Sequence, residues 1–274
     1  MLVEFAFPHL WRWNTVLTGR KILNVEARGK AMLIHFSGGT TLYSHNQLFG
    51  SWGVIRNGGR PKPRKAIRLA IHTGEQIAVL YSATSIAVWQ SSELGVHPYL
   101  ARLGLDLLSD TTTPADVRAQ VDAPRFAGQR LASLLLDQGF LAGVGNYLRS
   151  EILFVCGLHP ALRLKDLSVA QRRKLADAAY AMTWQAYRHK GVTNDLARVA
   201  KLKDAGVPYR EYRHHVFRRS GLPCPQCGTG IERHDFSGRP VFVCPHCQPA
   251  PPGYRAIPSI PRPPRRVRTA PSEH

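Results

Sequence analysis

Acidic residues are scarce in this sequence. Its 274 residues include 18 Asp and Glu against 37 Lys and Arg, which gives a formal charge of +19 and a pI near 10.4. Such an excess predicts a polyanionic partner, nucleic acid before an anionic membrane surface, although a soluble protein can be basic without a partner of this kind. Because the excess runs along the whole chain, a polyanionic partner is the favoured interpretation.

Long apolar runs are also missing. No stretch approaches the roughly 18 consecutive apolar residues that a membrane-spanning helix needs. The opening segment, MLVEFAFPHLWRWN, has neither a basic start nor a small-residue cleavage site, so it does not resemble a signal peptide. The sequence therefore predicts a cytoplasmic protein with no membrane partner, in a compartment where thiols stay reduced.

Cysteine is rare as well, and four of the five cysteines fall in one short segment. They form two C-x2-C pairs separated by sixteen residues. Four thiolates spaced in this way form a closed, tetrahedral structural zinc site that leaves no open position for catalysis. A redox pair or an iron–sulfur cluster are the alternatives. The expected ligands of one structural Zn²⁺ are Cys224, Cys227, Cys244 and Cys247.

The residues around this cluster carry further expectations. The segment DFSGRPVFV reads as two short strands closed into a hairpin, with Arg239 at its tip. A rigid loop that offers a guanidinium suits a phosphate contact, but a solvated arginine in a turn fits equally well. His234 and His246 are expected at the surface, because four thiolates already fill the metal's shell. Cys156 is expected to be a small buried hydrophobe.

The pattern along the rest of the chain predicts an α+β protein. Residues 21–95 are expected to be antiparallel β: a hairpin of AMLIHF with TTLYSH and a second of AIRLAIH with QIAVLYS, with a Gly/Pro/basic loop at 57–65 between them. We expect the following segments: 1–110, an antiparallel β-sandwich domain truncated at its start; 111–125, a linker; 126–215, a helical domain; 216–248, a zinc finger; and 249–274, a disordered Pro- and Arg-rich tail.

In the helical domain, three boundaries are predicted from local signals. QRLASLLLDQG should bury its leucines and end at Gly139, YLRSEILFVC should close at Gly157, and Ser168 with Gln171 forms a capping box for a longer helix. A basic loop is expected over 201–215. The tail arginines either add non-specific DNA affinity or have no role.

Residues 134–154, LLLDQGFLAGVGNYLRSEILF, predict two helices joined by a glycine-containing turn. Asn146 is expected to cap the second helix, whose free N–H groups and positive dipole end would form an anion site. A plain helical hairpin with a good cap is an equally good interpretation of this segment alone.

The combination of segments resembles the formamidopyrimidine-DNA glycosylase and endonuclease VIII family, and its endonuclease VIII branch in particular. The resemblance covers about Phe5 to Gln248 and rests on five segments: FAFPHL, EARGKAMLIHFS, TLYSHNQLFG, LLLDQGFLAGVGNYLRSEIL and SGRPVFVCPHCQ. It implies a helix–two-turn–helix within 126–215. It also implies a monomeric, nucleoid-associated base-excision-repair enzyme that flips oxidised pyrimidines out of duplex DNA, removes them, and breaks the strand by β,δ-elimination.

The resemblance also implies roles for individual residues. Asn146 and Arg239 would bind the phosphates around the lesion, and Lys30 would contact DNA near the active site and assist the chemistry, where a solvated strand-end lysine is the alternative. An apolar wedge that replaces lost stacking lowers the cost of base flipping. The residues that fill the gap would be Gln47, Leu48 and Phe49. Phe49 stands where the family's relatives carry Tyr, and strand core is the alternative for the apolar pair.

The resemblance does not extend to the family's N-terminal Pro-Glu segment, whose proline amine attacks C1′ of the sugar to form a Schiff base. This sequence starts MLVEF, with Leu2 and Val3 in those places, and Pro8 is inside the chain. A misassigned start, a truncated and inactive product, or a non-catalytic reader of damaged DNA would each explain this. A fourth explanation is that Lys30 supplies the amine, provided that its pKa is lowered.

Overall fold

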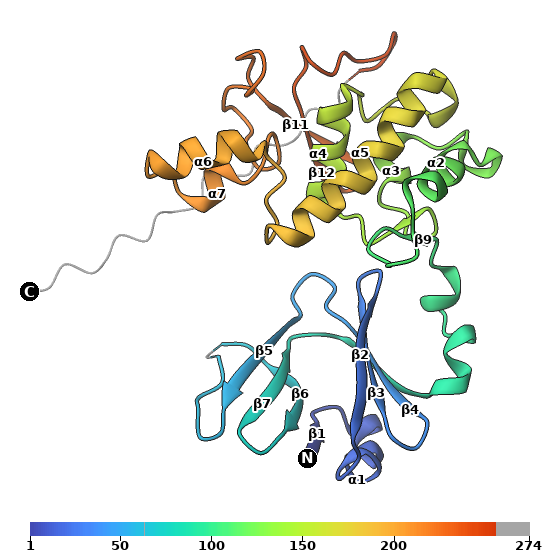
Figure 1. The fold of residues 1–274 in the computed structure, drawn as a ribbon, viewed down its shortest axis with the longest axis vertical. Helices are drawn as coiled ribbons and strands as arrows, with labels where there is room; N and C mark the ends of the chain where they lie inside the picture. The colour runs from blue at the N-terminus through green and yellow to red at the C-terminus, as the bar shows by residue number, and fades with distance from the viewer. Residues whose placement is uncertain (63, 256–274) are drawn as a thin grey trace, which may run out of the picture. The chain divides into compact units, whose positions relative to one another are not determined.

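The computed structural model describes residues 1–62 and 64–255, so most of the expected tail lies outside the described residues. The chain divides into two compact units (Figure 1). The first contains residues 1–120 and 137–144, and the second contains residues 121–136 and those from 145 onward. The segment boundaries expected from the sequence stay predictions.

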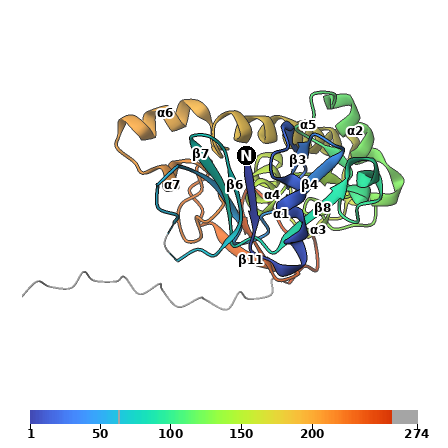
Figure 2. The ribbon, with the colours of Figure 1, turned by 90° about the horizontal axis from the view of Figure 1, so that it is seen from below.

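Two four-stranded antiparallel sheets form most of the first unit. One sheet has the order β1-β6-β7-β5 and the other the order β2-β3-β4-β8; β3 and β4 lie side by side in both views (Figures 1 and 2). The strands are β1 (Leu2–Phe5), β2 (Ile22–Arg28), β3 (Ala31–Phe36), β4 (Thr40–His45), β5 (Ser51–Arg56), β6 (Ile67–His72), β7 (Gln76–Tyr81) and β8 (Ser85–Gln90). The expected β-sandwich and both hairpins are confirmed.

The core of the sandwich lies between the two sheets, because alternate residues of each strand point to the same face. Buried apolar side chains from both sheets meet there: Val3, Phe5, Ile34, Phe36, Leu42, Leu69, Ile71 and Leu80. Helix α1 (Arg12–Leu17) adds the buried Leu17 to this core, and its Asn14 Oδ1 accepts a hydrogen bond of 2.9 Å from the Phe5 amide.

The remaining elements of the chain are mainly helical. Strands β9 (Leu105–Asp106) and β10 (Leu141–Ala142) pair in parallel within the first unit. The helices that follow α1 are α2 (Pro114–Asp122), α3 (Leu131–Leu134), α4 (Asn146–Cys156), α5 (Val169–Arg188), α6 (Leu196–Asp204) and α7 (Tyr209–Tyr212). Short 3-10 turns lie at Pro8–Leu10, Ser91–Val96, Leu100–Arg102, Pro124–Phe126 and Leu164–Asp166. A hairpin of β11 (Glu232–Phe236) and β12 (Arg239–Val243) follows in the second unit.

Two of the predicted helix boundaries are confirmed and one is wrong. Helix α4 ends at Gly157 in the left-handed conformation, and α5 begins with the Ser168–Gln171 capping box. Helix α3, however, stops at Leu134 rather than near Gly139. The Asp137 carboxylate accepts a hydrogen bond of 2.8 Å from the Gly139 amide, so a turn replaces the continued helix.

Two further helices lie in charged sequence where no helix was predicted. Residues 201–215, expected as a loop, contain the end of α6 and the whole of α7. The Asp195 carboxylate accepts a hydrogen bond of 2.8 Å from the Arg198 amide and caps α6 at its start. Cys156 behaves as expected: it is buried, and burial raises the pKa of its thiol to about 12. None of the helices within residues 1–62 and 64–255 is both long and apolar enough to span a bilayer.

His234 is buried, so its expected surface position is wrong. Its two ring nitrogens lie 2.8 Å from a Glu232 carboxylate oxygen and 3.2 Å from the Tyr254 hydroxyl, and these contacts satisfy the ring away from water. The Tyr254 ring in turn packs edge-on against the ring of His159, at 4.7 Å between centroids. The chain after the last cysteine therefore folds back over the hairpin as far as residue 255.

We expect His159 to make the second unit less stable in mild acid. Burial lowers the pKa of His159 to about 4, against an ordinary value of 6.5. Below pH 7, His159 is therefore protonated in the unfolded chain but stays neutral in the folded chain. The free energy of unfolding falls as the pH drops, by about 1 kcal/mol at about pH 5.5. Thermal unfolding at both pH values measures the loss.

A His159→Asn variant is the matched comparison, because an asparagine oxygen can take the place of His159 Nδ1, which accepts from the Ala161 amide at 3.1 Å. The variant should lose less stability than the parent protein over the same interval. An equal loss in both would exclude His159 as the cause.

Candidate functional site

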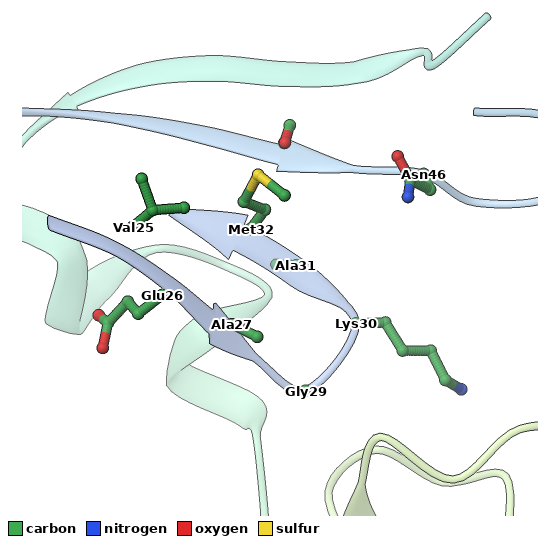
Figure 3. A pocket seen from close by; sticks show the side chains of 9 residues that line it. Val25, Glu26, Ala27, Gly29, Lys30, Ala31, Met32 and Asn46 are labelled. Carbon is green, nitrogen blue, oxygen red and sulfur yellow. The ribbon is translucent and has the colours of Figure 1, made fainter. Parts of the chain in front are cut away.

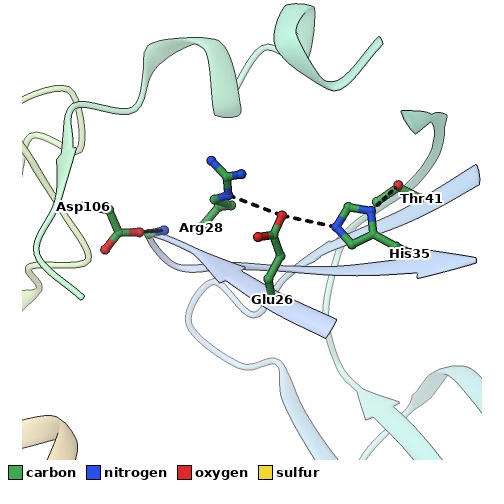
Figure 4. Close-up of polar contacts among 6 residues, drawn as sticks. Glu26, Arg28, His35, Thr41 and Asp106 are labelled. Carbon is green, nitrogen blue, oxygen red and sulfur yellow. Dashed lines mark hydrogen bonds and ion pairs between the residues drawn. The ribbon is translucent and has the colours of Figure 1, made fainter. Parts of the chain in front are cut away.

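Lys30 stands at the turn between β2 and β3. Two contacts fix the main chain of this turn. The Gly29 amide donates to Asp106 Oδ2 at 2.7 Å (Figure 4). The Lys30 amide donates to the Tyr99 hydroxyl at 3.1 Å. Lys30 Nζ donates to the Val144 carbonyl at 2.6 Å. The side-chain nitrogen is therefore held in a defined place within the first unit.

A cavity of about 360 Å³ opens beside this turn. Figure 3 shows Lys30 at one end of it, with its side chain extending away from the strands. The other lining residues are Val25, Glu26, Ala27, Gly29, Ala31, Met32, Ser44 and Asn46. The cavity thus has apolar walls and four polar side chains, an amine, a carboxylate, a hydroxyl and a carboxamide, a composition typical of a site for an organic ligand.

Charged side chains brace the strand that forms one wall. Glu26 Oε1 lies 3.3 Å from Arg28 Nε and 3.2 Å from His35 Nε2, and His35 Nδ1 lies 2.9 Å from the Thr41 hydroxyl (Figure 4). These contacts tie β2, an edge strand, to β3 and β4. They fix the strand pair that ends at Lys30.

Residues 46–50, the wedge loop, connect β4 to β5 at the same end of the sheet as Lys30, because Ala31 pairs with His45. Leu48 and Phe49 are 84% and 76% exposed, so the alternative of strand core is wrong for both. Large apolar side chains at this exposure have no packing role in the folded chain. They suit contact with another molecule.

The backbone of the wedge loop is tightly constrained. The Gly50 amide donates to the Asn46 carbonyl at 2.7 Å, and a Cβ at Gly50 would stand 2.5 Å from that oxygen, so only glycine fits. Gln47 adopts a left-handed φ of 50°, and its carboxamide oxygen accepts from the Thr84 hydroxyl. The loop is therefore a rigid support for its two apolar side chains.

His45 completes this support as a neutral acceptor. Burial, followed by the nearby charge of Lys30, lowers the pKa of His45 below its ordinary value. The Gln47 amide donates to His45 Nδ1 at 3.0 Å, which requires that nitrogen to be unprotonated. His45 is therefore held in the neutral form that this hydrogen bond requires.

In the second unit, Asn146 is the first residue of α4 and not its cap. Gly145 takes the capping position with an extended backbone, and its carbonyl accepts from the Arg149 amide at 2.9 Å. The Asn146 Oδ1 is buried without a hydrogen-bond partner among the described residues. As an acceptor, this oxygen would need a donor such as a buried water molecule.

Arg239 lies at the tip of the β11–β12 hairpin and is exposed. The turn before it, Ser237–Gly238, has φ values of 51° and 73°, which match the tight hairpin turn that favours glycine. The hairpin holds Arg239 at a fixed point where its guanidinium faces solvent. This geometry suits a phosphate contact.

Arg149, which the sequence reasoning missed, connects α4 to this hairpin. Its side chain is fully buried and donates to three carbonyls: Ala132 at 2.9 Å, Pro240 at 2.8 Å and Arg239 at 3.4 Å. Burial lowers the pKa of Arg149 to about 10, so it stays charged at neutral pH. An arginine on a helix otherwise rich in apolar residues was the signal available.

Glu151, on the same helix, was also missed by the sequence reasoning. It is fully buried, and its carboxylate accepts from three consecutive main-chain amides at 2.7–2.9 Å and from the Thr193 hydroxyl at 2.7 Å. The three amides belong to His215, Val216 and Phe217. This one side chain anchors the segment that leads into the cysteine cluster.

The four clustered cysteines fit a structural zinc ion. Their sulfurs all lie within 4.8 Å of one another, and three pairs are separated by 3.5, 3.5 and 3.9 Å. Four sulfurs at about 2.3 Å from a tetrahedral centre would be about 3.8 Å apart. The Gln226 and Cys247 amides point at Cys224 and Cys244 sulfurs at 3.4 Å, which favours thiolates. One structural zinc ion is therefore assigned to this site.

The predicted site residues fall into two groups. The first unit brings together Lys30 and the wedge loop, and the second brings together Asn146 and Arg239, because Arg149 lies one helical turn after Asn146 and contacts the Arg239 carbonyl. The four zinc ligands belong to the second group. Each unit thus contributes its own candidate contacts.

Three family models match the chain. They are the formamidopyrimidine-DNA glycosylase N-terminal domain at residues 5–83, the formamidopyrimidine-DNA glycosylase H2TH domain at 103–196, and the zinc finger found in FPG and IleRS at 221–250. Endonuclease 8 of Escherichia coli O17:K52:H18 is 42% identical over 246 residues, which is 90% of each chain. Endonuclease 8 of Salmonella agona matches at the same identity and coverage.

Solved structures agree on the fold. Lactococcus lactis formamidopyrimidine-DNA glycosylase, crystallised non-covalently bound to DNA containing an AP site, superposes with a TM-score of 0.74 at 18% identity, over 91% of each chain. Its complex with DNA containing FAPY-dG gives 0.74 at 19% identity, over 91% of this chain and 92% of that one. With the sequence relatives, these matches place the chain in the formamidopyrimidine-DNA glycosylase and endonuclease VIII family, to which it belongs.

Proposed function

We propose that this protein is a base-excision-repair DNA glycosylase and AP lyase that removes oxidised pyrimidines from duplex DNA and nicks the strand by β,δ-elimination. The observation that carries the proposal is the wedge loop: two exposed apolar side chains stand on a rigid turn, at the same end of the sheet as an amine-lined cavity. The chain that holds them is 42% identical to Endonuclease 8. Such an enzyme would act at the nucleoid in the cytoplasm.

The wedge loop would act in base flipping. A flipped nucleotide leaves a gap in the base stack, which costs a few kcal/mol in lost stacking. Leu48 and Phe49 would enter this gap, and Gln47 would meet the base left opposite. Their exposure in the free protein means that insertion breaks no internal packing. The phenyl ring of Phe49 retains the stacking face of a tyrosine without its hydroxyl.

Asn146 and Arg239 would hold the phosphates around the lesion. Asn146 would donate from the N–H groups of its carboxamide to a phosphate oxygen. The exposed Arg239 guanidinium can make charge-assisted hydrogen bonds to phosphate oxygens. Phosphate contacts fix the register of the duplex and leave recognition of the base to the cavity and wedge.

Lys30 would contact the flipped nucleotide and assist the chemistry. As an unprotonated amine it can attack C1′ of the abasic sugar; loss of water then gives a Schiff base. Removal of a C2′ proton would expel the 3′ phosphate, and a second elimination would expel the 5′ phosphate. The α-amino group of Met1 lies at the other end of its sheet from the wedge loop. Leu2 pairs with His72, at one end of β6. The other end of β6 pairs with Tyr81, which also pairs with Ser51, the residue directly after the wedge loop.

A Leu48→Ala/Phe49→Ala variant tests the proposed role of the wedge. We expect excision of thymine glycol from a duplex to slow by about tenfold or more, since about 1.4 kcal/mol of lost gap filling corresponds to one factor of ten. Binding to undamaged duplex should not change, because neither side chain carries charge. Single-turnover base release and fluorescence anisotropy measure the two quantities.

Val54→Ala is the matched control, because Val54 is an apolar side chain on β5 that is 64% exposed and lies outside the wedge loop. It should leave excision unchanged. Equal slowing in both variants, or none in the double variant, would count against the wedge.

A further inference from the structure

The first unit carries a strongly basic segment that the proposed function does not use. Residues 56–65 connect β5 to β6 and contain five cations and no acid. We call this segment the basic arm. Its cations, all exposed, are Arg56, Arg60, Lys62, Arg64 and Lys65; residue 63 lies outside the described residues.

The strand register shows where the basic arm runs. It leaves β5 at Arg56, which pairs with Gln76, and it enters β6 at Ile67, which pairs with Tyr81. Ser51, at the opposite end of β5 from Arg56, also pairs with Tyr81. The arm therefore returns along the sheet to the end where β5 begins, directly after the wedge loop.

Specific contacts hold the second half of the basic arm at that end. Lys65 Nζ donates to the Ser51 hydroxyl at 3.0 Å. The Lys62 amide donates to the Tyr81 hydroxyl at 3.3 Å, and Lys62 Nζ stands 5.6 Å from the centre of the Tyr81 ring. Three cations within four residues are thus concentrated beside the wedge loop, without a neighbouring acid in the segment to neutralise them.

We propose that the basic arm binds the phosphate backbone of the duplex next to the wedge, through Lys62, Arg64 and Lys65. The proposal rests on the proposed function, because it takes DNA as the partner. A cluster of like charges raises the free energy of the folded chain by self-repulsion, and a polyanion removes that cost. The wedge loop would place the backbone within reach, since Lys65 already contacts Ser51.

Phosphate contacts release bound counterions, so they make affinity depend on salt and not on base identity. The arm should therefore strengthen binding to damaged and undamaged duplexes by the same factor. The ratio of the two affinities, which reports lesion recognition, should not depend on the arm.

An Arg64→Gln/Lys65→Gln variant tests the proposal. Affinity for a duplex with a tetrahydrofuran abasic-site analogue is measured by anisotropy between about 50 and 200 mM salt. Two lost phosphate contacts should lower the slope of log affinity against log salt by about 1.8, with a loss on the order of 50-fold at about 0.1 M salt. Adding Lys62→Gln should lower the slope by about 0.9 more.

The matched control is Arg20→Gln/Lys21→Gln. This is also an exposed Arg-Lys pair in the first unit, and its removal changes the net charge equally. It lies at the far end of β3 from the wedge loop: the Lys21 amide donates to the Ser37 hydroxyl at 3.1 Å, and the Arg20 guanidinium lies against Gly38. The control should leave the slope unchanged.

Two results would overturn the proposal. An unchanged slope in Arg64→Gln/Lys65→Gln would mean that the arm does not touch DNA and is free for another partner, such as a protein module that binds basic, proline-containing segments. Equal changes in both pairs would mean a general effect of net charge. Failure of the proposed function would give a different result: the unmodified chain would bind the abasic and the undamaged duplex with equal affinity.

Discussion

Replacement of Cys244 with serine is expected to eliminate zinc binding and unfold the hairpin that carries Arg239. Structural zinc contributes about 10–16 kcal/mol in small metal-binding domains, far more than the local apolar contacts can replace. Those contacts are centred on Cys224, Cys244, Ile231 and Phe242, so loss of the metal also opens this small core. The variant should bind damaged duplex at least tenfold more weakly than the parent.

Zinc content and trypsin sensitivity measure this effect directly. The parent should hold one zinc per chain, and a chelator should expose the arginines of the hairpin to trypsin while the sandwich stays intact. Cys156→Ser is the matched control, because Cys156 is buried outside the cluster. It should keep its zinc. A Cys244→Ser protein that retains zinc and resists trypsin would contradict the assignment of this ligand.

Replacement of Glu151 with glutamine is expected to destabilise the second unit by about 3 kcal/mol, because each buried donor left without an acceptor costs about 1–3 kcal/mol. Each carboxylate oxygen accepts at least one main-chain amide, so an NH₂ group at either position faces a donor. Thermal unfolding should report a midpoint lower by about 10 °C.

Asp122→Asn is the control for Glu151→Gln. Asp122 is a carboxylate of the same unit that pairs with Arg172 at 2.7 Å but is 57% exposed at its side chain. Exposed pairs contribute about 1 kcal/mol or less, so its midpoint should change by a few degrees at most. Similar small shifts in both variants would show that the Glu151 amide contacts do not support the fold.

The sandwich could be predicted because its signals are local. The β-prone residues of AMLIHF and TTLYSH, with Gly38 and Gly39 between them, specify a hairpin within fifteen residues of sequence. The end of α3 could not be predicted, because the turn that follows it is held by a contact between the Asp137 carboxylate and the Gly139 amide that no sequence pattern announces. Helix α6 was hidden by charge, although Asp195 was a usable capping signal.

In the candidate site, too, residues that act through local spacing could be predicted, whereas residues that act through contacts far along the chain could not. The cysteine spacing specifies its own geometry, so the ligands were predictable. Arg149 and Glu151 contact partners 91 and 65 residues away, and no spacing in the sequence indicates such contacts. The sequence likewise identified Leu48 and Phe49 only through family resemblance, and their exposure became evident from the structure.

The most direct test of the central claim is borohydride trapping on a duplex that contains one thymine glycol. A DNA glycosylase that is also an AP lyase passes through a Schiff base, which borohydride reduces to a stable covalent link. We predict a covalent protein–DNA adduct with the damaged duplex and none with the undamaged one, and Lys30→Ala then shows whether Lys30 supplies the amine. Tight, damage-specific binding with neither adduct nor strand cleavage would contradict the account.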